Sequence, residues 1–265
     1  MKLIMENWRA WKESVENFPA DGMKPINQNA YDIHPGGANS ELNLSKYNLD
    51  PRIEKKVKLL LTNESLKDIG VRLYKPDYFK RDGIFYTIQY ANMSTRDGRS
   101  SSDPGGPGGS VGISLPHKVQ KLKDGPCLEG AVITSSRVTK GWGPLLYEIA
   151  LEVASHLSFG LAPDRGTSKT GVSSFAREVW AKYATRSDVE KHQLDVDLQT
   201  TIGGQPGQNL TPDRNDDCNQ TATYNDPGGP MSKLIGHPLT FMYKKNNHNT
   251  YKALFDHKRI IDRTG

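Results

Sequence analysis

The sequence contains little cysteine and no long apolar run. Its two cysteines, Cys127 and Cys218, are too few for a disulfide framework or a cysteine-rich metal cluster. No apolar stretch approaches the roughly 18–20 residues that cross a bilayer. Residues 1–8 carry charge within their apolar stretch and lack a signal-peptide cleavage pattern. We therefore expect an intracellular protein that holds no metal and does not contact a membrane.

Hydrophobic residues are also scarce for a chain of 265 residues, at 35%, whereas there are 25 glycines and 16 prolines. This composition predicts one core of about 100–150 residues that is surrounded by polar loops and arms. We place the core at residues 50–186, with a flexible insertion at 94–112. Residues 1–49 are expected to form a leader helix and an extended arm, and residues 187–265 an irregular extension with a basic tail.

The first sixteen residues have the pattern of a short amphipathic helix. Ile4, Trp8, Trp11 and Val15 recur at helical spacing on one stripe. Because tryptophan offers a large apolar area, we expect this stripe to dock on the body of the same chain or on another protein. The asparagine-, glycine- and proline-rich residues 17–49 then form the extended arm.

Alternating and helical apolar patterns divide the core into strands and helices. Asp50 followed by Pro51 is a good helix start, with aspartate as the N-cap and proline at the first helical position. The predicted helix over residues 144–157 has a wide apolar stripe, and we expect Glu148, Glu152 and His156 to lie on its solvent face. The patterns predict strands over residues 71–75, 84–92, 128–138 and 158–164, and helices over 144–157 and 173–186. In the irregular C-terminal extension, residues 239–243 are a further candidate strand.

The stretch with the clearest chemical character is the glycine-containing turn at residues 138–144, Val-Thr-Lys-Gly-Trp-Gly-Pro. Gly141 and Gly143 allow positive φ and a close approach of a ligand to the backbone, and Pro144 suits the first turn of a helix. A helix N-terminus presents free backbone N–H groups and the positive end of the helix dipole, which together suit a pyrophosphate. Lys140 adds a full positive charge at the same rim.

A glycine turn before a helix also occurs as a plain structural turn, so the pattern alone leaves both interpretations open. A P-loop needs Gly-Lys-Ser/Thr at the helix start, which this turn lacks. A dinucleotide-binding fingerprint needs a third glycine three residues after Gly143, where Leu146 stands. Both of these nucleotide sites are therefore excluded.

Residues 128–186, in the order strand, glycine turn, helix, strand and helix, resemble the core of the GNAT family of N-acetyltransferases. The resemblance implies a mixed α/β (α+β) fold whose mostly antiparallel sheet is flanked by helices. It also implies acetyl-CoA or another acyl-CoA as the cosubstrate, with its pyrophosphate at the turn, and a small-molecule or protein amine as the acceptor. The family opens this turn with glutamine or arginine, whereas Val138 stands there and Arg137 comes one residue early. The cofactor-binding residues would be Arg137, Val138, Thr139, Lys140, Gly141, Trp142, Gly143 and Pro144.

The resemblance also assigns catalytic residues. In this family the second helix often bears a tyrosine that protonates the leaving thiolate. The family's spacing puts Trp180 at that position, and Tyr183 lies about one turn further along the same face, so Tyr183 would be the acid. A buried core tyrosine is the alternative interpretation. Glu129, at the head of the first strand of this segment, is the candidate base for the amine, with a solvated glutamate as its alternative.

The two ends of the chain suggest other functions. Residues 1–16 resemble leader helices that direct proteins of tailed bacteriophages into the prohead, and the tripeptide at 4–6, Ile-Met-Glu, fits the pattern that prohead proteases recognise. The first alternative is therefore an inactive GNAT-like virion or assembly protein that contacts phage structural proteins. It would lie in the virion or in the cytoplasm of the infected host cell. The net charge of +5 suggests, as a second alternative, a nucleic-acid-modifying acyltransferase, whose basic tail contains Lys244, Lys245, Lys252, Lys258, Arg259 and Arg263.

Overall fold

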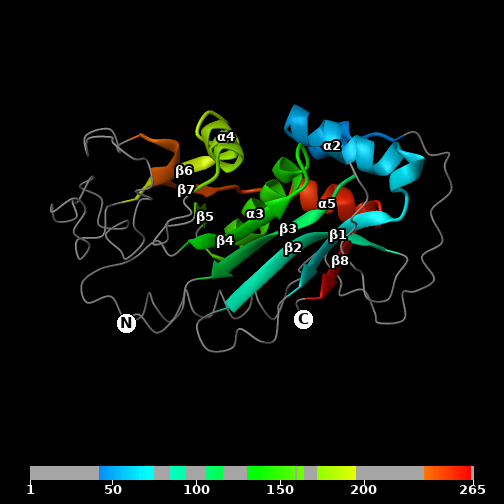
Figure 1. Ribbon diagram of the computed structural model, residues 1–265. Helices are drawn as coiled ribbons and strands as arrows, with labels where there is room; N and C mark the ends of the chain where they lie inside the picture. The colour runs from blue at the N-terminus through cyan, green and yellow to red at the C-terminus, as the bar shows by residue number, and fades with distance from the viewer. Residues whose placement is uncertain are drawn as a thin grey trace, which may run out of the picture.

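One sheet of eight strands organises the computed structural model (Figure 1), in the spatial order β6-β7-β5-β4-β3-β2-β1-β8. Neighbouring strands are antiparallel except β4 with β5 and β1 with β8, which are parallel. The structure describes residues 42–74, 84–93, 106–115, 130–158, 160–163, 172–194 and 236–263. The strands are β1 (Ile69–Tyr74), β2 (Ile84–Asn92), β3 (Gly109–Leu115), β4 (Ala131–Val138), β5 (Leu161–Ala162), β6 (Glu190–Gln193), β7 (Phe241–Lys244) and β8 (Ile260–Arg263).

Strands β1 to β4 form an antiparallel meander whose side chains alternate between two faces. Val71 and Leu73 on β1, and Ile88 and Tyr90 on β2, are fully or almost fully buried. Side chains two residues apart share a face of a strand, so these residues form one apolar layer. The predicted strand over residues 84–92 is confirmed with the same bounds.

Strand β3 was not predicted, because its first residues belong to the stretch that we expected to be a flexible insertion. Residues 109–112, Gly-Ser-Val-Gly, pair with the end of β4. A Cβ atom at Gly112 would lie 2.6 Å from the Ser135 hydroxyl oxygen, and one at Gly109 would lie 1.9 Å from the Arg137 carbonyl oxygen. Glycine thus allows a close approach of two strands here. Residues 94–105 lie outside the described residues.

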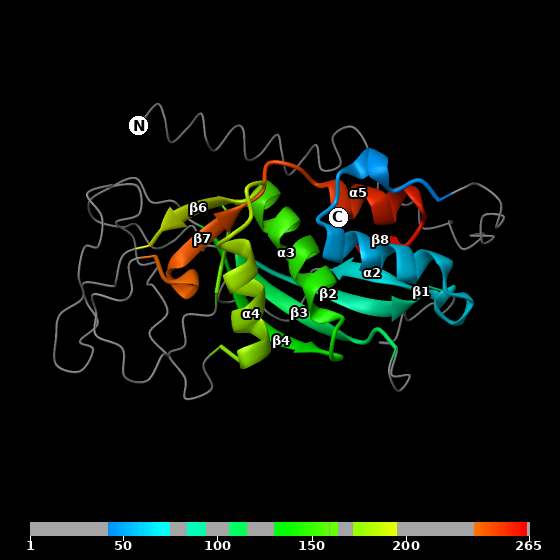
Figure 2. The same ribbon diagram turned by 90° about the horizontal axis from the view of Figure 1, so that it is seen from above.

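Helices α2 (Pro51–Thr62), α3 (Gly143–Leu157) and α4 (Ser174–Tyr183) lie on one face of the sheet, with α3 in the middle (Figure 2). The Asp50 carboxylate accepts a hydrogen bond from the Arg52 amide at 2.9 Å, which confirms aspartate as the N-cap of α2. Ser173 caps α4 in the same way, at 3.3 Å from the Ala176 amide. The predicted starts of all three helices are correct to within one residue.

The predicted fold class is confirmed: the protein has a mixed α/β fold in which helices flank a curled, mostly antiparallel sheet. This arrangement is compatible with a GNAT-like fold. In the described ranges, none of the helices combines the length and the apolar character that crossing a bilayer requires.

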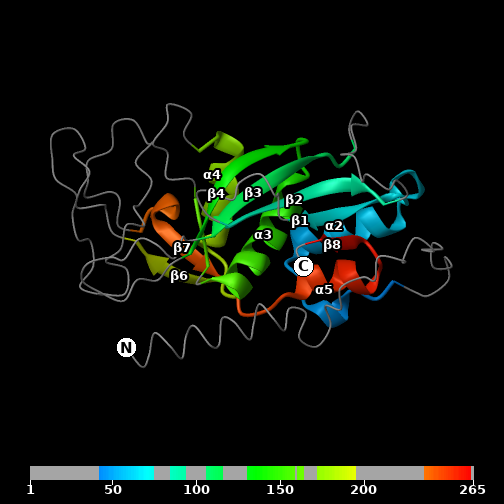
Figure 3. The same cartoon turned by 90° about the horizontal axis from the view of Figure 1, so that it is seen from below.

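Where it is described, the chain after residue 187 is not an irregular extension. Residues 236–263 form β7, helix α5 (Asn249–Asp256) and β8, and β6 precedes them. Because β7 pairs with β5 and β8 pairs with β1, this segment contributes strands near both ends of the sheet (Figure 3). The strand predicted over 239–243 corresponds to β7, but the rest of this segment was wrongly predicted to be irregular, because elements this short show no clear periodicity. Residues 195–235 lie outside the described residues.

The cations near the C-terminus do not form a solvated tail. Lys245 is 2% exposed, and the Arg259 guanidinium donates hydrogen bonds to two backbone carbonyls before and at the start of β1, at 3.3 and 3.2 Å. Lys252 lies 3.1 Å from the Asp256 carboxylate on the next turn of α5. The contacts of Lys245 and Arg259 attach the segment to the body of the protein, whereas Lys252 pairs within α5 and stays exposed.

The end of the predicted N-terminal arm is also packed. Leu44, Tyr47 and Leu49 are buried in the core, and the Tyr47 hydroxyl donates a hydrogen bond to Asp256 at 2.8 Å. Residues 42–49 therefore belong to the body of the protein and contact α5. The predicted leader helix and the rest of the arm, residues 1–41, lie outside the described residues.

Candidate functional site

The glycine turn has the predicted backbone shape. Gly141 adopts a φ of 82°, a left-handed conformation that favours glycine. Helix α3 begins at Gly143, with Pro144 in its first turn. A Cβ atom at Gly143 would have no described neighbour within 4 Å, so the N-terminus of α3 opens onto free space.

Two amides of this turn are used internally, which corrects the prediction that all of them face a ligand. The Thr139 amide donates to the Gly108 carbonyl and the Trp142 amide donates to the Thr139 carbonyl, each at 3.0 Å. For the amides of Lys140, Gly141 and Gly143, the described residues provide no acceptor. Three amides, rather than five, are therefore available to an anion.

Trp142 is an anchor of the turn rather than a ligand-binding side chain. It is 5% exposed, its ring packs edge-on against Tyr90 with centroids 5.7 Å apart, and its carbonyl accepts a hydrogen bond from the Tyr90 hydroxyl at 2.9 Å. The Lys56 ammonium lies 4.8 Å from the centre of the same ring. This contact brings a cation from α2 to the turn, which the sequence patterns did not predict.

Strand β4 leaves one edge open as it approaches the turn. It pairs with β5 only through its first two residues, Ala131 and Val132, whereas on its other edge it pairs with β3 as far as Val138. The register with β3 shifts between Gly112 and Ile113, so that Thr134 has no partner residue on β3. Such a β-bulge changes the direction of the strand. Beyond Val132, the described residues supply no strand partner on the β5 side, and Arg137 is exposed there.

Helix α3 buries two carboxylates that we expected on its solvent face. Glu148 is 0% exposed and Glu152 is 1% exposed, because the C-terminal segment covers this side of the helix. The Lys245 ammonium bridges them, at 2.7 Å from Glu148 and 2.6 Å from Glu152. Glu152 also accepts hydrogen bonds of 3.0 and 2.8 Å from two amides at the N-terminus of α5.

Arg186 joins this network from the residues after α4. Its guanidinium donates two hydrogen bonds to Glu148, at 2.6 and 2.9 Å, and two to Asp188, at 2.9 and 2.6 Å. Burial alone would lower the pKa of Arg186, but the bonds to Asp188 and Glu148 outweigh it and raise the pKa. Asp50 lies 4.0 Å from the same guanidinium. The network therefore ties the starts of α2 and α5 to α3.

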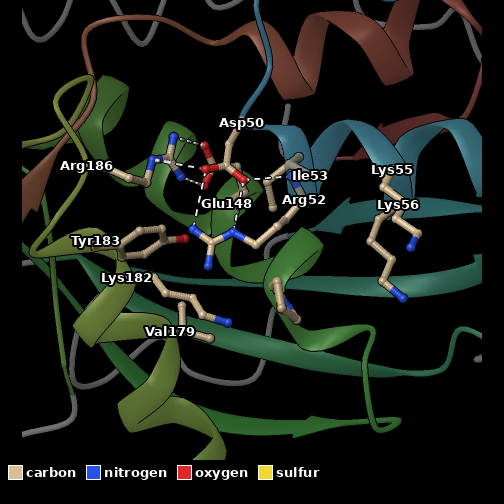
Figure 4. Close-up of a pocket in the computed structure, with 11 residues that line it drawn as sticks. Asp50, Arg52, Ile53, Lys55, Lys56, Glu148, Val179, Lys182, Tyr183 and Arg186 are labelled. Carbon is tan, nitrogen blue, oxygen red and sulfur yellow. Dashed lines mark hydrogen bonds and ion pairs between the residues drawn. The ribbon is translucent and has the colours of Figure 1, made fainter.

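A cavity of about 280 Å³ lies beside this network, between α2, α3 and α4 (Figure 4). Its apolar wall consists of Ile53, Pro144 and Val179. Charged side chains enter it from all three helices and from the residues beside them. The cations that line it are Arg52, Lys55, Lys56, Lys182 and Arg186, and the anions are Asp50 and Glu148.

Tyr183, the predicted acid, lines this cavity. It is 3% exposed, and its buried hydroxyl has no hydrogen-bond partner among the described residues. In Figure 4 the hydroxyl points toward the space that Arg52 enters from α2. Burial, with a smaller contribution from Glu148, raises the pKa of Tyr183 well above its ordinary value. The hydroxyl therefore stays protonated at neutral pH and can donate a hydrogen bond.

Trp180, which the predicted resemblance puts at the family's tyrosine position, belongs to the core. It is 1% exposed and packs against Tyr147, Tyr183 and Tyr243, with ring centroids 5.8, 5.7 and 5.4 Å away. It cannot reach a ligand in the cavity without unpacking.

The structure brings together some of the predicted site residues. Pro144 of the turn and Tyr183 of α4 line the same cavity. Arg137, Val138 and Thr139 lie at the end of β4, and Lys140 is exposed in the turn. The predicted base, Glu129, lies outside the described residues. Sequence reasoning missed the cations of the cavity, although the polar face of α2 was a visible signal for Arg52, Lys55 and Lys56.

Comparisons with known proteins identify no relative: no family model, no curated protein and no solved structure matches the chain. Within the described ranges, no group of three or more histidine, cysteine, aspartate or glutamate side chains is placed to hold a metal ion. The function is therefore argued from the geometry above.

Proposed function

We propose that the protein transfers an acyl group from acyl-CoA to an amine, as the resemblance to the GNAT family implies. The observation that carries the proposal is the end of β4, where pairing with β5 stops after Val132 and the strand continues into the turn before α3. An extended acyl-CoA arm can lie along this open edge and form backbone hydrogen bonds, as peptides do at sheet edges.

The turn supplies a place for the pyrophosphate of the cofactor. The amides of Lys140, Gly141 and Gly143 lie at the positive end of the α3 dipole, which favours an anion. Two lysines add charge: Lys140 is exposed, and the Lys56 ammonium would lie 3.7 Å from a Cβ atom at Gly141. The absence of a described neighbour around Gly143 leaves room for the phosphates.

The chemistry of this proposal needs few reactive side chains. The amine attacks the thioester carbonyl directly, so that a C–N bond forms, the C–S bond breaks and the thiolate leaves. Positioning and polarisation of the carbonyl by backbone N–H groups along residues 134–138 supply most of the rate enhancement. The proton that the amine loses would pass to the thiolate through solvent, because Tyr183, the predicted acid, lines the separate cavity between α2, α3 and α4.

A thermal-shift experiment tests the proposal. Acetyl-CoA at about one hundred times its Kd should stabilise the wild type by about 2.7 kcal/mol, which is several degrees in Tm. Gly143→Glu should abolish the shift, because it places a carboxylate in the phosphate site. Acids are favourable at a helix start, so this variant should fold.

The matched control is Lys58→Glu, a charge change at an exposed position of α2 that is not part of the cavity lining. Its shift with acetyl-CoA should equal that of the wild type. If the wild type gives no shift at millimolar acetyl-CoA, or if Gly143→Glu keeps the full shift, the proposal is wrong.

The second candidate function is a non-catalytic assembly protein with an enzyme-like core. The observation that favours it is the use of the Thr139 and Trp142 amides within the turn, which reduces the donors left for a cofactor. This second function predicts that acetyl-CoA changes the Tm of neither the wild type nor Gly143→Glu. The nucleic-acid alternative has less support, because Lys245 and Arg259 of the predicted basic tail are engaged in contacts within the protein.

A further inference from the structure

We propose that the cavity between α2, α3 and α4 binds a small organic phosphate, at a site separate from the open edge of β4. The inference rests on the unpartnered Tyr183 hydroxyl, the surplus of cations at the rim and the apolar wall between them. It goes beyond acyl transfer and does not depend on it.

The inner end of the cavity offers one donor that the protein itself does not use. The Tyr183 hydroxyl is buried, points toward the space that Arg52 enters (Figure 4) and has no partner among the described residues. A buried polar group without a partner destabilises the folded state unless something bonds to it. Arg186 and Glu148 satisfy each other beside it through two hydrogen bonds. A ligand oxygen at this end would therefore bond to Tyr183 rather than to a free charge.

The rim has positive charge that the protein does not neutralise. In the described part of the chain, Lys55, Lys56 and Lys182 take part in no ion pair. The Arg52 guanidinium contacts both oxygens of the Asp50 carboxylate, at 3.4 and 3.5 Å, and half of its side chain is exposed. Figure 4 shows the Lys182 ammonium directed from α4 toward the side on which α2 carries its lysines.

This arrangement of cations favours a phosphate over a single carboxylate. Lysine binds phosphate as a point charge, and several lysines around one opening suit a group with a charge near −2. Lysines on a helix surface often serve solubility alone. Here, however, they surround a cavity that also contains an apolar wall and an unused buried donor, and solubility does not require either feature.

The apolar lining and the volume of the cavity restrict the part of the ligand that does not carry the phosphate. Ile53, Pro144 and Val179 form an apolar surface between the rim and Tyr183. The volume of about 280 Å³ lies just below the range of roughly 300–1,000 Å³ that is usual for small-molecule sites. The ligand class is therefore a phosphate monoester with a compact apolar body and an oxygen that can accept a hydrogen bond from Tyr183.

Calorimetric titration of the full chain with phenyl phosphate tests the proposal. We expect saturable binding, and inorganic phosphate should bind roughly tenfold more weakly because it cannot cover the apolar wall. Tyr183→Phe should weaken phenyl phosphate binding by roughly tenfold through loss of a hydrogen bond to a charged group. Lys182→Ala should also weaken it, whereas Lys58→Ala, which changes an exposed lysine of α2 outside the cavity lining, should leave it unchanged.

Two further measurements distinguish binding in this cavity from misfolding of the variant and from binding at the open edge of β4. Without ligand, Tyr183→Phe should melt at the same temperature as the wild type or higher, because the lost hydroxyl has no partner among the described residues. Saturating CoA should weaken phenyl phosphate binding only slightly, through Lys56, which lies near both sites, and should not displace it. The proposal is overturned if phenyl phosphate does not bind saturably, if Tyr183→Phe binds it like the wild type, or if CoA displaces it. If acetyl-CoA does not raise the Tm, the acyltransferase proposal is wrong, but the phosphate-site proposal is not affected.

Discussion

Replacing Glu148 with glutamine should lower the free energy of unfolding by roughly 3–5 kcal/mol, the usual cost of removing one partner from a buried ion pair. Glu148 is fully buried and accepts hydrogen bonds from both Arg186 and Lys245. Glutamine keeps the shape of the side chain but removes the negative charge. The two cations then remain buried near each other with less compensation, which is the physical reason for the loss.

Urea unfolding, followed by circular dichroism, measures this change. The control is Glu178→Gln, the same substitution at an exposed position of α4, which should change the free energy of unfolding by no more than about 0.5 kcal/mol. Arg186→Gln should also destabilise the protein, and the double variant should lose less than the sum of the two single losses, because the partners are in contact. A loss below about 1 kcal/mol for Glu148→Gln would show that the network is not intact in solution.

Replacing Trp180 with alanine should lower the free energy of unfolding by roughly 3–5 kcal/mol, because the change removes a large buried side chain and leaves a cavity. Trp180 stacks on Tyr243 of β7, with ring planes 25° apart, and meets Tyr147 and Tyr183 edge-on. It therefore joins α4 to α3 and to the end of the sheet. Aromatic pairs of this kind contribute beyond the area that they bury.

Phe175→Ala is the matched control for Trp180→Ala. Phe175 lies on the same helix but is 65% exposed, so its removal should change the free energy of unfolding by no more than about 0.5 kcal/mol. Chemical denaturation of both variants provides the comparison. Equal losses for the two aromatic residues would mean that α4 does not pack on the core as described.

The sequence patterns predicted those parts of the fold that depend on local signals. Asp50 before Pro51, and Ser173 before its helix, are capping patterns that act within a few residues, and both helix starts are correct. The strand over 84–92 alternates clearly, and its bounds are confirmed. The positive φ of Gly141 is also as predicted, because the glycine turn is a local feature.

The parts that could not be predicted depend on partners that are distant in the sequence. Glu148 looks solvent-facing on a helical wheel, and it is buried because Lys245, 97 residues away, meets it. The cavity likewise takes its cations from two helices that the chain order separates, so no short motif contains Lys56 and Lys182 together. Tyr183 was a candidate only through the resemblance, and its position in the lining of the cavity could be seen only once α2 was placed.

The most direct test of the central claim is hydrogen exchange at the turn before α3. If acyl-CoA binds with its pyrophosphate at this helix start, saturating acetyl-CoA should slow exchange of the amides of Lys140, Gly141 and Gly143, which the described residues leave without an acceptor. The Thr139 and Trp142 amides, already bonded within the protein, should change little. Unchanged exchange at all three amides under saturating acetyl-CoA would contradict the account.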